Sequence, residues 1–185
     1  MIYLMRHGKD DERYVGGYSD VDLTREGQRQ VLDSALWLKK NDVDVTRIYS
    51  SDVRRAVSSA NIVSSILHKK VIIDSNLREL DKGILNGMLV KKALVDYPEY
   101  FNDVKIGTVY PKGESMIMFY KRVVKWLDKV KDYDNSLIVT HRGFINMIYF
   151  YLNNIELSMD KEQFDVTHAS IHMLDINKKK IRRIK

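Results

Sequence analysis

The sequence predicts an α/β fold in three layers, with a mostly parallel central sheet and helices on both of its faces. Short apolar runs alternate along the chain with longer segments that carry apolar residues at helical spacing. Strands that alternate with helices form parallel sheets, because each helix carries the chain back across one face of the sheet. At 185 residues the chain is long enough for a sizeable core, and we expect a single domain over residues 1–185.

The first half of the chain is expected to contain three strands and two helices. Gly16 and Gly17 lie in a polar stretch and indicate a loop after the first strand. Thr24 is a suitable N-cap for the first helix, which has Val31 and Ala35 on one face. The expected elements are a strand at 2–5, a loop at 9–22, a helix at 24–40, a strand at 47–50, a helix at 53–68 and a strand at 71–73.

The second half is expected to add three helices and two strands. Pro98 ends the first of these helices, and Gly107, Pro111 and Gly113 indicate a surface loop over the crevice that helps to select the substrate. Ser115 is expected to cap the following helix. The expected elements are a helix at 89–97, a loop at 98–114, a helix at 115–133, a strand at 137–140, a helix at 143–152 and a strand at 169–175.

The positive charge of the chain is concentrated at one end of the sequence. Six of the 31 basic residues lie in the segment 178–185, which has no acidic residue. The rest of the chain therefore has 25 basic and 25 acidic residues and is formally neutral. We expect the basic segment to be a solvated end or an edge strand, and we expect no nucleic-acid partner.

Composition also indicates the cellular compartment in which the protein is expected to work. The chain has no cysteine, which excludes disulfides and thiolate metal ligands. No apolar run approaches the roughly 18 residues that span a bilayer, and the N-terminus has no signal-peptide pattern. We therefore expect a cytoplasmic protein without a membrane partner.

Three predicted strands end in residues that suit phosphate chemistry. Arg6-His7-Gly8 follows the first strand, Ser50–Ala56 follows the second, and Thr140-His141 ends a later one. Ligands of open α/β sheets bind at the carboxyl ends of the strands, so these segments are expected to meet at one rim. Arginine matches phosphate oxygens with a fork of donors, and histidine can be a nucleophile. Arg54 and Arg55 point about 100° apart on a helix, so only one can face the crevice, and spacing alone does not decide which.

Together these segments resemble the histidine phosphatase superfamily, also called phosphoglycerate mutase-like. The segment Asp20–Gly27 resembles the family's Asp-x-Pro-Leu-Thr-x-x-Gly, and Leu77–Leu80 with Gly83 and Gly87 resembles its acid-bearing segment. The motifs run in the family's order from residue 2 to about residue 175. In length the chain is similar to small members such as α-ribazole phosphatases and broad-specificity acid phosphatases.

The resemblance implies roles for individual residues. His7 becomes the nucleophile that forms a phosphohistidine, and the family's arginine directly before an alanine selects Arg55 over Arg54. Glu79 becomes the general acid that protonates the leaving oxygen and then the base that activates water. Asp81, two residues further on, is its rival. The implied phosphate-binding residues are Arg6, His7, Arg55, His141 and Arg142.

Several positions depart from the family pattern and leave the substrate open. Lys9 and Asp10 follow Gly8 where the family commonly has Glu-Thr. Arg13 and Tyr18 are candidate substrate contacts in the following loop. The additional cations Lys9, Arg13 and Arg142 favour an anionic small molecule.

The sequence therefore predicts a metal-independent phosphomonoesterase without a cofactor, acting on a small anionic phosphorylated metabolite. A phosphoglycerate mutase is one alternative, but the family's mutases have a longer insertion than the 31 residues between Glu79 and Pro111. A protein phosphohistidine phosphatase and a non-enzymatic binding protein with a basic tail are the others.

Overall fold

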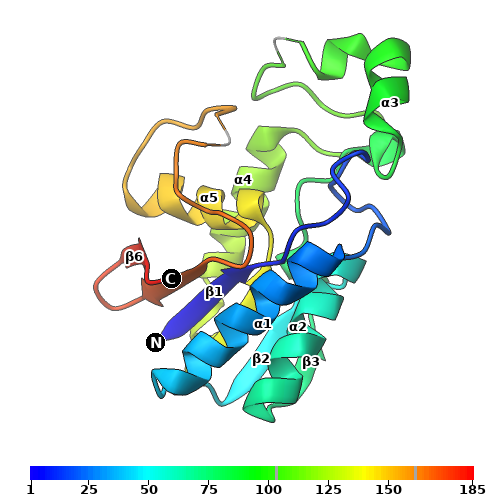
Figure 1. Ribbon diagram of the computed structural model, residues 1–185. Helices are drawn as coiled ribbons and strands as arrows, with labels where there is room; N and C mark the ends of the chain where they lie inside the picture. The colour runs from blue at the N-terminus through cyan, green and yellow to red at the C-terminus, as the bar shows by residue number, and fades with distance from the viewer. Residues whose placement is uncertain (103, 161) are drawn as a thin grey trace.

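Six strands form one sheet in the order β3-β2-β4-β1-β5-β6 in the computed structural model, which describes residues 1–102, 104–160 and 162–185 (Figure 1). The strands are β1 (Ile2–Arg6), β2 (Arg47–Ser50), β3 (Val71–Ile73), β4 (Ser136–Thr140), β5 (Ile171–Asp175) and β6 (Lys180–Arg183). The pairs β1–β4, β2–β4 and β2–β3 are parallel, whereas β5 runs antiparallel to both β1 and β6. The sheet is thus mostly parallel, as the sequence predicts, and β1, β2 and β4 all end at the same edge.

Helices cover both faces of this sheet. The α-helices are α1 (Arg25–Lys40), α2 (Arg54–Leu67), α3 (Val90–Asp96), α4 (Met116–Leu127) and α5 (Arg142–Leu152). One face is covered by α1 and α2 and the other by α4 and α5 (Figure 1). Neighbouring strand residues enter different cores, since Leu4 packs with Phe119 and Phe144 whereas Met5 packs with Val31 and Ala60. The expected three-layer α/β architecture is confirmed.

The predicted helix caps are present. Thr24 Oγ1 accepts a hydrogen bond from the Gly27 amide at 3.0 Å, and Ser115 Oγ accepts one from the Met118 amide at 3.2 Å. The helix predicted at 115–133 is too long, because the corresponding helix α4 ends at Leu127. The chain then tightens into i→i−3 hydrogen bonds and forms a 3₁₀-helix at Val130–Tyr133.

The basic C-terminal segment is an edge strand, which was one of the two expected outcomes. In β6, Ile181 is buried against the core, whereas Lys180, Arg182 and Arg183 are exposed. Charged side chains on an edge strand oppose pairing with other chains.

The segment between the acid motif and α4 lies apart from the two helix layers, around α3 (Figure 1). The expected loop at 98–114 contains a 3₁₀-helix at Pro98–Tyr100, and its residue 103 lies outside the described residues. Tyr100 and Phe101 pack against the core on the α4–α5 face. Within the described residues, no helix is both long and apolar enough to cross a membrane.

Candidate active site

The ends of β1 and β4 bring two histidines together. The His7 amide donates to Thr140 O at 2.9 Å, which continues the β1–β4 ladder past the end of β1. The rings of His7 and His141 consequently lie edge to face, with centroids 5.2 Å apart. Arg55, in the first turn of α2, enters the same place, and its Nε lies 3.1 Å from His7 Nε2. The three residues expected at one rim are in contact.

A pair of glycines makes this approach possible. A Cβ on Gly8 would lie 2.3 Å from Gly27 O, and a Cβ on Gly27 would lie 2.1 Å from Lys9 O. Side chains at either position would force the backbone after β1 away from α1. The glycines of the Arg-His-Gly and Leu-Thr-x-x-Gly segments therefore fix the position of His7.

The hydrogen bonds of His7 define its tautomer. Its Nδ1 lies 2.7 Å from Gly8 O, an acceptor, so Nδ1 carries the proton. Nε2 is then the unprotonated nitrogen, and its lone pair accepts a hydrogen bond from Arg55 Nε. Burial, followed by the charge of Arg55 and by His141 and Arg6, holds the pKa of His7 well below its ordinary range. His7 is thus a neutral imidazole near neutral pH, which is the form of histidine that can attack phosphorus.

Arg55 is held on several sides, with only 2% of its surface exposed. Nη1 donates to Ser19 Oγ at 3.1 Å, Nη2 donates to Gly17 O at 2.8 Å, and Nε lies 3.3 Å from Asp10 Oδ2. Arg54, the rival position, points outward and forms ion pairs on the surface. Burial raises the pKa of Asp10 in spite of the pairing with Arg55, so the charged form of this carboxyl lowers the stability of the fold.

His141 is fully buried beside Arg55. Arg55 Nη2 donates to His141 Nδ1 at 3.3 Å, so the proton of the neutral ring lies on Nε2, which donates to Ser51 Oγ at 2.9 Å. Burial, and then Arg55 and Arg6, lower the pKa of His141 well below its ordinary range. In this arrangement the hydrogen bond to His141 helps to hold the Arg55 guanidinium in position.

Arg6 is the other buried arginine of the site and is 6% exposed. Its Nη1 donates to Val166 O at 3.0 Å, and its Nη2 donates to His168 Nε2 at 2.6 Å. Burial is the largest cause that lowers the pKa of Arg6, to about 10, so the guanidinium stays charged at neutral pH.

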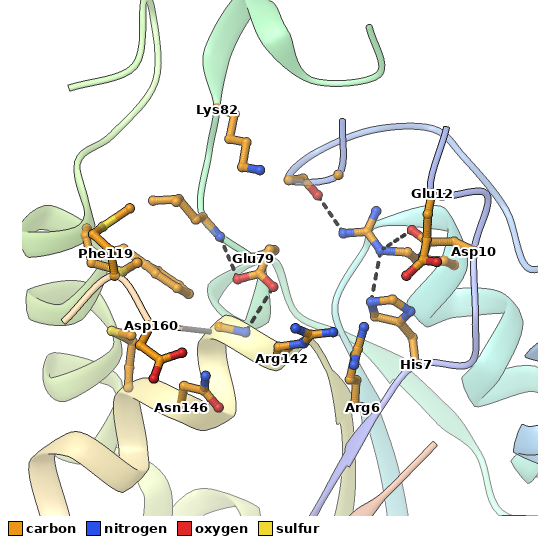
Figure 2. Close-up of a pocket in the computed structure, with 18 of the residues that line it drawn as sticks. Arg6, His7, Asp10, Glu12, Glu79, Lys82, Phe119, Arg142, Asn146 and Asp160 are labelled. Carbon is orange, nitrogen blue, oxygen red and sulfur yellow. Dashed lines mark hydrogen bonds and ion pairs between the residues drawn. The ribbon is translucent and has the colours of Figure 1, made fainter. Parts of the chain in front are cut away.

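Glu79 lies between the arginines and the apolar wall of the cavity (Figure 2). Its two carboxylate oxygens accept from the Leu80 and Gly143 amides, both at 3.0 Å. A Cβ on Gly143 would lie 2.2 Å from Glu79 Oε1, so the glycine at the start of α5 leaves room for this carboxylate. Asp81, its rival, accepts from the Gly83 amide and from Asn86 Nδ2 and shapes the turn that follows.

A cavity of about 280 Å³ opens over these residues. Arg6, His7 and Asp10 lie on one side of it, and Phe119, Asn146 and Asp160 lie on the other (Figure 2). The lining residues that sequence analysis did not propose are Asp10, Glu12, Tyr14, Gly16, Gly17, Leu80, Lys82, Met116, Phe119, Gly143, Asn146, Met147, Phe150, Ser158, Met159 and Asp160. Of these, the glycine- and tyrosine-bearing loop after β1 was expected in general terms, whereas the segment 158–160 carried no recognisable signal.

Two expected substrate contacts lie elsewhere. Arg13 is exposed and forms a bidentate ion pair with Asp11, two residues away, with Nε 2.9 Å from Oδ1. Tyr18 lies under the Arg78 guanidinium, 4.8 Å from the ring centre, and neither residue lines the cavity. Local partners therefore hold both side chains outside the cavity lining, and their role as substrate contacts stays a prediction.

The additional cations are largely offset. Lys9 pairs with Glu26 at 2.8 Å on the surface of α1. Arg142 does line the cavity, but it also forms an ion pair with Glu162. The described part of the 98–114 loop contributes nothing to the lining, so the expectation that it lies over the crevice is not met there. Within the described residues, no three His, Cys, Asp or Glu side chains are grouped to hold a metal ion.

The site combines a neutral histidine and two buried arginines with a carboxylate across the cavity, an arrangement that suits phosphoryl transfer. Comparison with known proteins agrees. The family description "Histidine phosphatase superfamily (branch 1)" matches residues 2–184. The chain belongs to this superfamily, and it is a phosphatase.

Individual relatives cover most of the chain. A Hydrogenobacter thermophilus protein named "Putative phosphoserine phosphatase 2" is 36% identical over 166 residues, which are 84% of this chain and 80% of that protein. An Escherichia coli protein named "Probable phosphoglycerate mutase GpmB" is 32% identical over 149 residues, 76% of this chain and 68% of its own. The crystal structure of the α-ribazole phosphatase from Shigella flexneri has the same fold, with a TM-score of 0.82 at 24% identity over 98% of this chain and 93% of that one.

Proposed function

We propose that the protein is a metal-independent phosphomonoesterase that forms a phosphohistidine on His7 Nε2. One observation carries the proposal. The Gly8 carbonyl fixes the His7 proton on Nδ1, which leaves the Nε2 lone pair at the cavity between Arg6 and Arg55. A neutral, oriented imidazole between two cations is suited to attack a phosphate ester.

In the first step the phosphate group enters between Arg6 and Arg55, and Arg55 Nε transfers its hydrogen bond from His7 Nε2 to a phosphate oxygen. Nε2 then forms a bond to phosphorus while the bond from phosphorus to the leaving oxygen breaks. Glu79 donates its proton to that oxygen, so the alcohol leaves neutral. His141 holds Arg55 in place, and the Arg142 side chain supplies positive charge at the rim.

In the second step Glu79, now a carboxylate, takes a proton from water. The water oxygen forms a bond to phosphorus as the bond between phosphorus and Nε2 breaks. Inorganic phosphate leaves, and both His7 and Glu79 return to their starting states. Every group in this cycle is a side chain of this chain, so no metal ion is required.

The substrate is proposed to be a small phosphorylated metabolite. A cavity of about 280 Å³ suits a compact molecule. The names of the relatives suggest which compounds to test first: phosphoserine and phosphoglycerate. Because one relative is named a probable mutase, transfer of the phosphoryl group back to the substrate is the second candidate, and its product would be an isomeric phosphate ester instead of free phosphate.

The test combines product analysis with trapping of the intermediate. With wild-type protein, a rapid alkaline quench within the first turnover should leave label from ³²P-substrate on His7, stable in base and labile in acid. His7→Ala should remove both the label and turnover, and EDTA should leave the wild-type rate unchanged. Label on another residue, or a strong loss of activity in EDTA, would refute the proposal.

A further inference from the structure

Arg6 lies on a wall between two cavities. One is the cavity that His7 and Glu79 line, and the other, of about 390 Å³, lies behind Arg6 and Arg142 and is lined by residues 162–168. Arg6 therefore borders open space in both cavities. Glu162 and Asp165 also line this second cavity and would attract a displaced arginine, although they pair with Arg142 and Arg183.

Two hydrogen bonds tie the guanidinium to the segment that lines the second cavity. Nη1 donates to Val166 O at 3.0 Å, and Nη2 donates to His168 Nε2 at 2.6 Å. The His168 and His7 rings lie 6.0 Å apart, centroid to centroid, so this contact is next to the nucleophile. The bond to Val166 uses a carbonyl of the main chain, whereas the bond to His168 depends on the side chain at this position.

The contact requires one protonation state of His168. Arginine can only donate, so Nε2 must have a free lone pair and the ring proton must lie on Nδ1. Burial, followed by the charges of Arg6, Arg142 and Lys9, lowers the pKa of His168 to about 3. The ring is therefore neutral at any pH at which the protein is expected to work, and the acceptor is permanently available.

We propose that His168 is a positioning residue that fixes the orientation of the Arg6 guanidinium at the boundary between the phosphate site and the second cavity. The inference rests on the proposed function, because it assigns His168 to the support of the phosphate-binding arginine in that site. A hydrogen bond to a charged donor is stronger than one between neutral groups, and at 2.6 Å it orients the fork that a phosphate must meet. A merely structural histidine would affect folding but not phosphate affinity.

Three variants separate these roles. His168→Leu keeps similar bulk but removes the acceptor. His168→Gln retains an acceptor, because its side-chain oxygen reaches about as far along the side chain as Nε2 does. His172→Gln is the matched control: this buried histidine lies four residues further along, and it bonds Tyr149 and Ser170 and does not line either cavity.

The measurements are the Kd of inorganic phosphate by calorimetry, kcat and KM for p-nitrophenyl phosphate, and Tm. His168→Leu should weaken phosphate binding about 10- to 100-fold and lower kcat/KM by a similar factor, since charged hydrogen bonds have this strength. His168→Gln should restore affinity to within about threefold of wild type. His172→Gln should leave phosphate affinity unchanged even if Tm falls. Should His168→Leu fail to fold, His168→Ala carries the same prediction.

Phosphate affinity in His168→Leu equal to wild type would overturn the role of His168. The same holds if His168→Gln binds as poorly as His168→Leu, or if His172→Gln weakens phosphate as much. Failure of the wild-type protein to bind phosphate would instead refute the proposed function, so the two failures can be told apart.

Discussion

A Glu79→Gln variant is expected to lose activity to a degree that depends on the leaving group. Glu79 is held by two backbone amides, at 3.0 Å each, and lies across the cavity from His7. Glutamine keeps the shape but has no proton to give to the leaving oxygen. General acid catalysis contributes about 10²–10⁴-fold, or about 2.7–5.4 kcal/mol of barrier, and this loss should appear in full for alkyl phosphates. For p-nitrophenyl phosphate the loss in the first step should be small, because p-nitrophenolate leaves without help.

The substitution also has a structural cost, which must be separated from the chemistry. The glutamine amide group must face either the Leu80 or the Gly143 amide, so one hydrogen bond is lost and stability should fall by about 1–3 kcal/mol. Asp81→Asn is the control, because Asp81 also accepts from a backbone amide, at 2.8 Å from Gly83, but lies outside the cavity lining.

The assay is kcat/KM for a series of phosphate esters whose leaving groups have graded pKa, with Tm measured for each variant. Glu79→Gln should show a steep dependence on the leaving group, and Asp81→Asn a dependence parallel to that of the wild type. A steep dependence for Asp81→Asn with a parallel line for Glu79→Gln would reverse the assignment. Equal losses on all esters in Glu79→Gln would refute a role in proton donation.

Two further perturbations test the surroundings of the phosphate site. Burial raises the pKa of Asp10 above its unfolded value, so the charged carboxylate costs stability at neutral pH. Asp10→Asn should therefore be stabilising relative to wild type at pH 7, with a gain that fades as the pH falls through that pKa. The variant should also bind phosphate about tenfold more tightly, since one anion near Arg55 is removed. Thermal unfolding at pH 7 and 4 checks the change in stability, and calorimetry checks the phosphate affinity. Weaker phosphate binding than in the wild type would contradict the predicted gain in affinity. Gly143→Ala should reduce kcat about 100-fold with the fold retained, because the new Cβ would overlap Glu79 and press on Phe119; near-normal kcat with normal circular dichroism would contradict this reasoning.

The sequence predicted the phosphate side of the site well, for a simple reason. Arg6, His7 and His141 directly follow buried strands, and the ends of parallel strands share one edge of a sheet. Once the alternation of strands and helices was recognised, their proximity followed. The choice of Arg55 over Arg54 did not follow from spacing, and it depended on the resemblance to the family.

Other parts of the site could not be predicted because they depend on how distant loops return to it. The segment 158–160 approaches through irregular chain that follows α5, where no periodic pattern constrains the backbone. The argument from the additional cations is weakened for a different reason. Net charge counts Lys9 and Arg13 as free, whereas Glu26 and Asp11 pair with them in the folded chain.

The charge of the whole chain is therefore a poor guide to what the cavity binds. Its lining includes four basic side chains, Arg6, Arg55, Lys82 and Arg142, together with four acidic ones, Asp10, Glu12, Glu79 and Asp160. Even with Glu79 protonated, as the proposed first step requires, the lining has an excess of only one positive charge, so net charge contributes little to the attraction of anions. Recognition of phosphate must come from the short-range geometry of two buried forks around His7, because such donors are strong only when they are held in place. This is why residues that merely hold those forks, such as Ser19 and Gly17 around Arg55, are expected to matter as much for phosphate affinity as the net charge of the rim.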